Sequence, residues 1–371
     1  MRAAVDVGSI SGAVALVGDV NQDVLWKEAI GHADVRTGTL MEPNAMFWAA
    51  SSLSKPLTAT AAMMMVDNGM LDLDAPVGRY LSKLSNVRPP FTVRQCLSHT
   101  SGLPFASMAE LEQRYGGFDR FEQSAFASYR RTGDDCVYDG LPLSDAVASY
   151  AHEKLLSLPG ERYWYSNAGF NVVGRVVEVL AGDEYASFIN QHLLKPLRML
   201  DTTLWPTKEQ LARLANCYGT GDGGGVDGSS LREVLFPQLT PPYHDLTRGV
   251  SPAGGFFSTA QDMARFGRMI LRGGELDGQR FLSERAVAEM TADHAGPAGL
   301  EYGLGWRICP SVPNDAASGG FGHSGATGVG LYLHPPTRRL VVLLVHQDGG
   351  CDYNDWWFEQ RRELLRFPFD P

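Results

Sequence analysis

The stretch that decides the fold reads SLSKPLTATAAMMMVDNG over residues 52–69. It is rich in alanine and methionine and has no clean polar face. A helix that is hydrophobic nearly all round lies in the interior of a protein. The stretch therefore predicts a central buried helix from Ser52 to Asn68, with Gly69 as its C-cap.

The first residues of this helix carry a possible nucleophile and base. Ser52 and Lys55 are three residues apart, so hydroxyl and amine share one helical face. Serine needs a neighbouring base, and a lysine in a water-poor site can be that base. The free N–H groups at a helix N-terminus would favour a developing oxyanion. A Ser-x-x-Lys pair also arises by chance, so other segments must decide.

Composition limits the possible classes of protein. The chain has 371 residues, of which 44% are hydrophobic and 20% charged, which fits a soluble enzyme with a large core. A net charge of −10 argues against a nucleic acid partner. No apolar run reaches the length of about 18 residues that a membrane span requires.

Cysteines and the N-terminus add little about location. The five cysteines are far apart and show no metal-binding spacing, so we expect reduced, mostly buried thiols. The N-terminus lacks the apolar core of a secretory signal. We therefore expect either a cytoplasmic protein or a trimmed periplasmic or secreted form.

Strand patterns occur at both ends of the chain. A hairpin is predicted over residues 11–32, and apolar β-rich runs lie at 302–308, 328–333 and 340–346. Helical patterns lie between them, with the clearest at 172–180 and 185–194. A capping box at Ser258–Gln261 predicts a helix to about Arg272, and residues 354–367 read as an amphipathic helix. One sheet built from both termini, with a helical insertion, is the architecture these patterns favour.

Three further segments carry polar groups suited to catalysis. Tyr165-Ser166-Asn167 precedes a predicted helix, and its tyrosine offers a second proton-transfer group while its amide can grip a carbonyl or orient the lysine. His323-Ser324-Gly325 leads into a strand, where small residues would let a substrate lie along the edge. His99, in the loop segment 97–104, is interpreted as structural, holding that loop by side-chain hydrogen bonds.

Taken together and in this order, Ser52-x-x-Lys55, Tyr165-x-Asn167 and His323-x-Gly325 resemble the three signatures of the serine β-lactamase and penicillin-binding-protein superfamily. Segments 98–104, 164–170 and 252–260 are most similar to its class C branch, which also holds family VIII esterases, D-aminopeptidases and DD-carboxypeptidases. The resemblance spans roughly residues 10–350.

The resemblance implies an α+β fold of the β-lactamase/DD-peptidase type. An antiparallel sheet flanked by helices would be built from residues 1–85 and 255–371, and residues 86–254 would form a mostly helical domain. The active site would lie at their junction.

The resemblance also implies two-step acyl transfer without a metal or cofactor. Ser52 would attack the carbonyl, Lys55 and Tyr165 would pass its proton to the leaving group, and water would release the acyl group. Backbone N–H groups of Ser52 and Ala326 would form the oxyanion hole, at about 3 kcal/mol for each donor. Asn167, His323 and Gly325 would bind the substrate.

One position departs from the β-lactamase pattern. His323 stands where that pattern has a lysine, whose permanent charge helps to hold a substrate carboxylate. We therefore expect an esterase or peptidase acting on a small ester, amide or β-lactam, with at most weak β-lactamase activity. A true class C β-lactamase or DD-carboxypeptidase, and a non-catalytic binding protein of the same fold, are the alternatives.

Substrate selection is expected to come from loops at 105–140 and 215–250, with Tyr138, Trp164 and Tyr243 as candidates for the pocket wall. Aromatic residues in loops are more often packing anchors. The sequence leaves the oligomeric state and the physiological substrate open.

Overall fold

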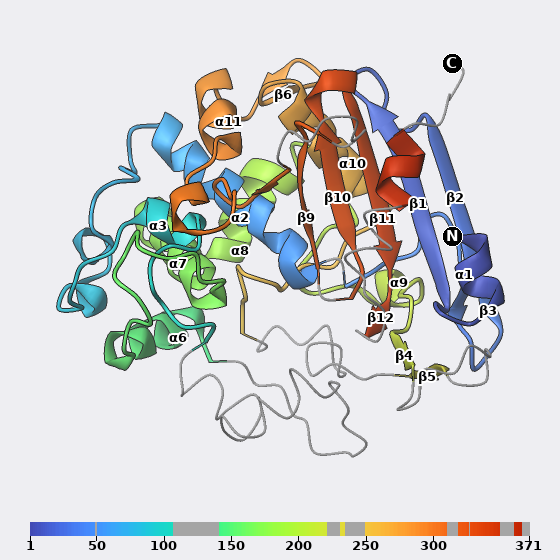
Figure 1. Cartoon of the computed structure of the whole chain (residues 1–371), viewed down its shortest axis with the longest axis horizontal. Coiled ribbons are helices and arrows are strands. Elements are labelled where there is room, and N and C mark those ends of the chain that lie inside the picture. The colour runs from blue at the N-terminus through green and yellow to red at the C-terminus, as the bar shows by residue number, and fades with distance from the viewer. Residues whose placement is uncertain are drawn as a thin grey trace.

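A computed structural model describes residues 1–48, 50–106, 141–220, 231–233, 249–309, 318–325, 327–348 and 360–365 (Figure 1). A sheet fills one side of the molecule, and a group of helices from the middle of the chain fills the other. The predicted α+β fold with a sheet from both chain ends is confirmed. The division into two domains stays a prediction.

The large sheet has seven strands in the order β3-β2-β1-β11-β10-β9-β8, and every neighbouring pair is antiparallel. The strands are β1 (Gly12–Asp19), β2 (Trp26–Asp34), β3 (Thr39–Leu40), β8 (Arg307–Ile308), β9 (Phe321–Ser324), β10 (Gly330–His334) and β11 (Arg339–Val345). The predicted N-terminal hairpin is present as β1 and β2. First and last thirds of the chain meet where β1 pairs with β11.

Five short strands lie outside this sheet. They are β4 (Tyr218–Thr220), β5 (Leu231–Glu233), β6 (Glu275–Leu276), β7 (Gln279–Arg280) and β12 (Gln347–Asp348). β12, β4 and β5 form a small sheet, and β6 pairs with β7.

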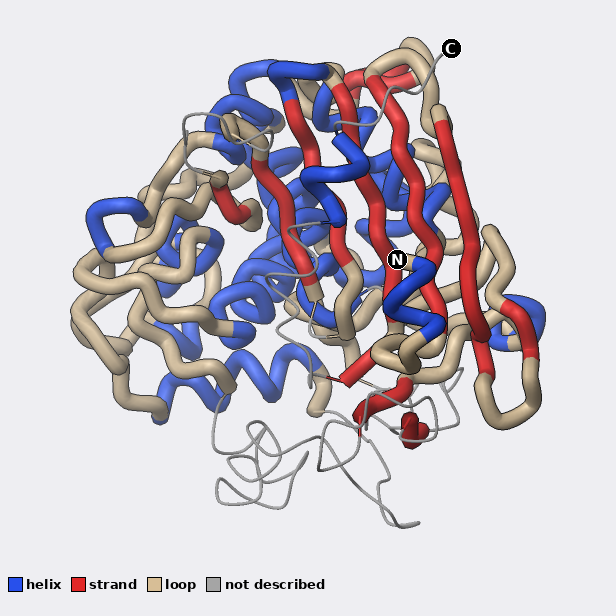
Figure 2. The backbone as a smooth tube through the Cα atoms, turned by 45° about the vertical axis from the view of Figure 1, so that its right-hand side comes forward, coloured by secondary structure: helices blue, strands red, loops and turns tan. Residues whose placement is uncertain are grey.

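Both faces of the large sheet are covered, which explains why its central strands are apolar without interruption. Successive side chains of a strand point to opposite faces. Val14 and Leu16 of β1 face the main core, whereas Ala13, Ala15 and Val17 face a second cluster that includes Leu364 and Leu365. Figure 2 shows α1 (Arg2–Asp6) and the helix at 360–365 over this second face. α10 (Ala260–Leu271) packs on the other face, against β1, β10 and β11.

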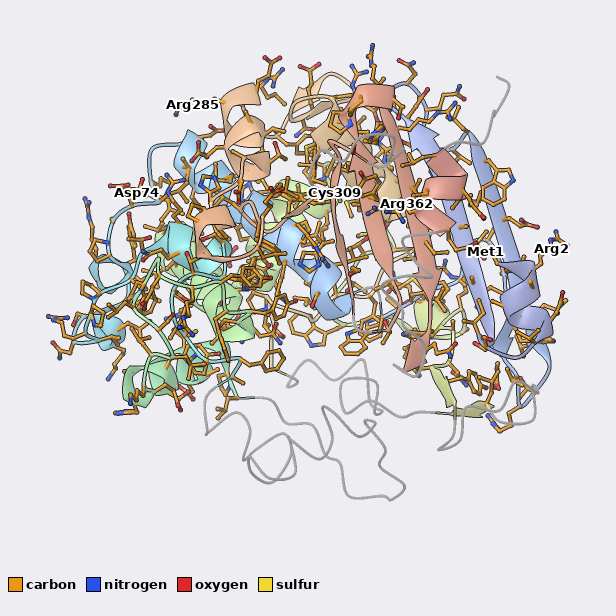
Figure 3. The ribbon with its side chains drawn as sticks, in the orientation of Figure 1. Met1, Arg2, Asp74, Arg285, Cys309 and Arg362 are labelled. Carbon is orange, nitrogen blue, oxygen red and sulfur yellow. The ribbon has the colours of Figure 1, made fainter. Side chains whose placement is uncertain are left out.

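The N-terminus is fixed at this outer face. The amino group of Met1 donates a hydrogen bond to Oε1 of Gln360, 3.0 Å away. Figure 3 shows Met1 and Arg2 at the side of the sheet where Arg2 forms an ion pair with Glu28 of β2. Residues 360–365 confirm part of the helix predicted for 354–367, whose other residues lie outside the described ones.

The middle of the chain is helical, as predicted. Its helices are α3 (Val93–Leu97), α6 (Leu143–Ser149), α7 (Asn167–Ala181), α8 (Tyr185–Ile189), followed by a π-helix over Asn190–Leu194, and α9 (Lys208–Leu211). α11 (Glu284–Thr291) follows α10. α7 contacts α2, α3, α6 and α8, so it is the centre of this group.

α2 (Ala50–Asp67) is the predicted central helix and begins two residues earlier than expected. Figure 1 shows it between the helical group and the β9 edge of the sheet, and it packs against both α7 and β9. Two glycines allow close contacts around α2 and α7. A Cβ on Gly305 would lie 2.7 Å from Cβ of Ala59 in α2, and one on Gly174 of α7 would lie 2.2 Å from Cγ of Pro252.

Some boundaries differ from the sequence predictions. Only Arg307–Ile308 of the expected strand 302–308 pairs with β9, because Tyr302 and Arg307 bridge each other across a tight turn. The N-cap of α10 is Thr259, whose hydroxyl accepts a hydrogen bond from the Asp262 N–H, and not Ser258. β9 itself was not predicted, because its four residues include two small ones.

Within the described residues, Cys96 and Cys217 are buried and Cys309 is half-buried, and none of the three takes part in a disulfide. Cys136 and Cys351 lie outside these residues. No helix in the described part of the chain has the length and apolar character needed to span a membrane.

Candidate active site

Ser52 is the third residue of α2, so its backbone N–H is one of the first four in the helix and has no intrahelical acceptor. Its side chain is half-buried. Pro56 has no N–H, so the Ser52 carbonyl lacks the donor that would normally bond it four residues later in the helix. The hydroxyl thus lies at a helix end whose free donors and dipole both favour negative charge.

Lys55 is completely buried, and its amine has three neighbours. Nζ lies 3.2 Å from Oγ of Ser52, 2.8 Å from Oδ1 of Asn167 and 2.9 Å from the carbonyl oxygen of Ala253. These partners come from one turn earlier in α2, from the start of α7 and from the segment before α10. Three distant parts of the chain therefore converge on one nitrogen.

None of these partners carries a charge. Burial holds the pKa of Lys55 well below its usual 10.5, and no carboxylate in the described part of the chain lies within salt-bridge distance of it. A neutral amine has two hydrogens and one lone pair. In that form its two hydrogens suit Oδ1 of Asn167 and the carbonyl oxygen of Ala253, atoms that can only accept, and its lone pair would face Ser52.

Tyr165 is the second group in contact with the nucleophile. Its hydroxyl donates to Oγ of Ser52 at 2.5 Å, and its ring lies under the lysine, with Nζ 4.7 Å from the ring centroid. Burial raises the pKa of Tyr165 above its usual 10, although its bond to Ser52 opposes this shift. The group is therefore a phenol and a proton donor at neutral pH.

Asn167 orients the lysine, because Oδ1 accepts its hydrogen bond. Asn167 is the first residue of α7, and the hydroxyl of Ser166 caps that helix by accepting from the Gly169 N–H. The amide NH₂ of Asn167 has no partner in the part of the chain that the structure describes. It is the group that can reach a substrate carbonyl, a role that stays a prediction.

His99 holds the Tyr165 segment, which the sequence did not indicate. Its Nδ1 accepts from the Ser166 N–H at 3.0 Å, and its carbonyl accepts from the Trp164 N–H at 2.7 Å. Its ring packs on Tyr165 with centroids 4.3 Å apart. The hydrogen-bonding role expected for His99 is present, but it connects two segments and is not confined to its own loop. A φ of 59° at His99 is unusual for a residue with a side chain.

His323 lies on β9 with a nearly buried side chain. Its Nδ1 is 2.8 Å from the Ser324 carbonyl, and its Nε2 is 2.8 Å from the Tyr302 hydroxyl. Burial is the main cause that lowers the pKa of His323 to about 3. Sequence reasoning did not single out Tyr302, because it meets His323 only after the chain folds back from β8 to β9.

The remaining predicted site residues are less well placed by the structure. Gly325 follows β9, and its N–H donates to the Val329 carbonyl, so this N–H closes a turn. Ala326, the second expected oxyanion donor, lies outside the described residues, as do Tyr138 and Tyr243. Trp164 is 47% exposed. Its place in a pocket wall stays a prediction.

Metal binding has no support in the residues that the structure describes. These residues contain no group of three or more His, Cys, Asp or Glu side chains that could hold a metal ion. The site as built consists of a hydroxyl, an amine, a phenol and an amide.

Comparison with known proteins places this chain in a family. The model of the Beta-lactamase family matches residues 1–364. Protein Rv1367c of Mycobacterium tuberculosis (strain ATCC 25618 / H37Rv) is 28% identical over 386 residues, covering 93% of this chain and 88% of that protein. Esterase EstB of Burkholderia gladioli is 28% identical over 345 residues, covering 87% and 81%.

A solved structure shows the same fold. EstCE1, a hydrolase with promiscuous acyltransferase activity, superposes with a TM-score of 0.75 at 24% identity and covers 98% of this chain and 96% of that one. The resemblance drawn from the three motifs is confirmed. Since the family model extends over nearly the whole sequence, the chain belongs to the Beta-lactamase family.

Proposed function

We propose that this protein is a serine hydrolase that forms an acyl-enzyme on Ser52 and prefers esters. The observation that carries the proposal is the buried amine of Lys55, whose partners are all neutral and whose Nζ lies 3.2 Å from the Ser52 hydroxyl oxygen. A lysine in this state is a base, and a serine beside a base is a nucleophile.

The first half of the reaction uses both neighbours of Ser52. Oγ attacks the carbonyl carbon of the ester while its proton passes to the lone pair of Lys55. The carbonyl π electrons move to the oxygen, which the Ser52 N–H stabilises, together with the expected N–H of Ala326. When the intermediate collapses, the bond to the leaving alcohol breaks and Tyr165 protonates that oxygen. The lysine ammonium then returns its proton to Tyr165.

The second half repeats these transfers with water. Lys55 takes a proton from a water molecule that attacks the acyl carbon. When the intermediate collapses, the bond between the acyl carbon and Oγ of Ser52 breaks, Oγ takes a proton from Tyr165, and the acid leaves. The lysine ammonium then returns its proton to Tyr165. Each turnover consumes one water and leaves Lys55 neutral and Tyr165 protonated. No other reactant is required.

The third motif supports esters or amides over β-lactams. His323 supplies no fixed charge for the carboxylate that penicillins and cephalosporins carry. The similarity to an esterase over most of the chain points in the same direction. D-Amino-acid amides remain within the proposal, because the same acyl transfer would serve them.

Active-site labelling tests the proposal directly. The protein is treated with a fluorophosphonate and assayed with p-nitrophenyl acetate and butyrate, alongside Ser52→Ala and Ser54→Ala. Ser54 lies two residues away on α2, and its Oγ accepts from the Phe256 N–H. We expect labelling and turnover in the native protein and in Ser54→Ala, and a loss of about 10³-fold or more in Ser52→Ala. Equal turnover in the native protein and Ser52→Ala would refute it.

Two other outcomes would support the alternative functions. Rapid nitrocefin hydrolysis at nanomolar enzyme, or stable acylation by a fluorescent penicillin, would favour a β-lactamase or DD-carboxypeptidase. No labelling and no hydrolysis across a panel of esters, lactams and D-peptides would favour a binding protein that retains the fold.

A further inference from the structure

Tyr302 is a buried tyrosine that none of the three sequence motifs includes. Only 1% of its surface is exposed. Its backbone is fixed on both sides, since its N–H donates to Oδ1 of Asp293 and its carbonyl accepts from the His294 N–H, at 3.0 and 2.9 Å. Its hydroxyl is therefore held at one place, 2.8 Å from Nε2 of His323.

The hydrogen bonds of His323 determine which nitrogen carries the proton. The Ser324 carbonyl can only accept, so the Nδ1 beside it must carry a hydrogen. A neutral imidazole has a single N–H, so Nε2 has a lone pair and accepts from the Tyr302 hydroxyl. Burial raises the pKa of Tyr302 well above its usual 10, so this hydroxyl always has a proton to donate.

The surroundings of His323 oppose its protonation. The titratable and charged groups that act on this ring are Lys55 of α2, Arg307 of β8, the neutral imidazole of His99 and Tyr302 itself. Two of these are basic, and no carboxylate in the described residues forms an ion pair with the ring. A charged imidazole would be buried there without a counter-ion, which is costly.

We propose that Tyr302 is a specificity-determining positioning residue: its hydroxyl fixes His323 as a neutral imidazole with both nitrogens engaged, so that the site accepts uncharged acyl groups and discriminates against acyl groups bearing a carboxylate. This inference rests on the proposed function and names its substrate class. It assigns the discrimination to the hydrogen bond between Tyr302, which precedes β8, and His323 of β9, and not to the identity of the third-motif residue alone. β9 packs against α2, so the ring is part of the structure that borders the nucleophile.

The test compares two acyl groups of similar length that differ in charge. kcat/KM is measured for p-nitrophenyl butyrate and for mono-p-nitrophenyl succinate, from about pH 8 down to about pH 5, where an exposed histidine would become charged. In the native protein we expect a preference for the butyrate ester of at least about tenfold that changes little with pH. Removal of the donor by Tyr302→Phe should let the ring take up a proton beside a substrate carboxylate. In this variant the ratio of kcat/KM for the butyrate ester to that for the succinate ester should then fall by about threefold to tenfold as the pH is lowered.

Tyr163→Phe is the matched control. Tyr163 also packs against Tyr302 and His99, at centroid distances of 5.7 and 5.6 Å, but within the described residues it makes no hydrogen bond or ring contact with His323. We expect this variant to keep the native preference. NMR of the protein with ¹⁵N-labelled histidine gives a readout independent of activity: Nε2 of His323 should titrate at higher pH in Tyr302→Phe than in the native protein.

The outcomes separate this inference from the proposed function. Turnover of both esters with no charge preference, or a Tyr302→Phe variant with the native preference and the native ¹⁵N titration, would overturn the role of Tyr302 while leaving the hydrolase intact. No Ser52-dependent turnover of either ester would refute the proposed function, and the ¹⁵N titration would still report on the Tyr302–His323 bond.

Discussion

Two regions of the molecule hold basic side chains away from water, and they do so in opposite ways. At the junction of α10 with the β1–β2 turn, Arg265 and Arg268 both bind the carboxylate of Asp23, and Arg265 also binds Asp277. At the start of α2, Lys55 is buried among a hydroxyl, an amide and a carbonyl. In the first region carboxylates neutralise the arginines, whereas no described residue places an opposite charge beside Lys55.

This difference explains what each region can do. Burial tends to lower the pKa of Arg265, but its bonds to Asp277 and Asp23 outweigh burial and raise it, so the group stays a cation and joins two segments. For Lys55, burial acts without opposition and its pKa falls. A buried amine without a neighbouring carboxylate favours its neutral form, and the neutral form is the one that can act as a base.

Replacing Lys55 by arginine should have the largest effect on activity. Arginine keeps its charge in proteins and has no lone pair to offer Ser52. We expect kcat/KM for p-nitrophenyl butyrate to fall by about 10³-fold or more. Circular dichroism and thermal unfolding must show a folded variant. A folded Lys55→Arg protein with near-native activity would show that no neutral base is needed.

Asn167→Asp would make the lysine site resemble the arginine site. The new carboxylate would lie at the position of an amide whose Oδ1 is 2.8 Å from Nζ, which favours the charged lysine. We expect activity at neutral pH to fall by about 10²-fold, with the acidic limb of the pH–rate profile moving to higher pH. A parallel Asn167→Ala variant separates charge from lost orientation, since it should lower activity without that shift. An unmoved acidic limb in Asn167→Asp would contradict the argument.

Asp23→Asn tests the other region. Removal of the shared carboxylate leaves Arg268 facing a neutral partner and leaves Arg265 with Asp277 as its remaining ion-pair partner among the described residues, and we expect the free energy of unfolding to fall by about 1–3 kcal/mol. Activity of the folded protein should be unchanged, because no part of the proposed reaction involves this region. Denaturant unfolding and the esterase assay provide both measurements. A loss of activity without a loss of stability would break the comparison.

The buried histidines should also lower the free energy of unfolding in acid. The effect of each histidine should be smaller than the effects predicted above. The pKa of His346 is lowered to about 4 by burial, despite its hydrogen bond to the Ala215 carbonyl, and that of His323 is about 3. The unfolded chain therefore binds more protons than the folded protein below about pH 6.5. As the pH is lowered from there toward the folded-state pKa, the free energy of unfolding falls by about 1.4 kcal/mol per pH unit for each histidine.

His346→Gln sharpens this expectation. Glutamine can still donate to the Ala215 carbonyl but cannot titrate. The slope of unfolding free energy against pH, measured between about pH 4.5 and pH 6, should fall by the contribution of one proton. An identical slope in the native protein and the variant would mean that His346 is not kept neutral by its burial.

The motifs alone predicted which residues would carry the proposed chemistry, because that chemistry depends on residue type and short spacing. Ser52 and Lys55 are one helical turn apart, so any helix over this segment brings them together. The apolar run that follows predicts the burial that this lysine needs. The apolar patterns at the two chain ends likewise predict the strands β1, β10 and β11, because a buried strand must be apolar along its length.

Only the tertiary structure decided the partners that are distant in sequence. Asn167 is 112 residues from Lys55, and Tyr302 is 21 residues from His323, and no local pattern pairs them. The same holds for His99, whose bond to the Ser166 N–H spans 67 residues. Local sequence thus determined which groups could react. The charge state of these groups depends on burial and on neighbours supplied by other elements, and those exist only once the chain has folded.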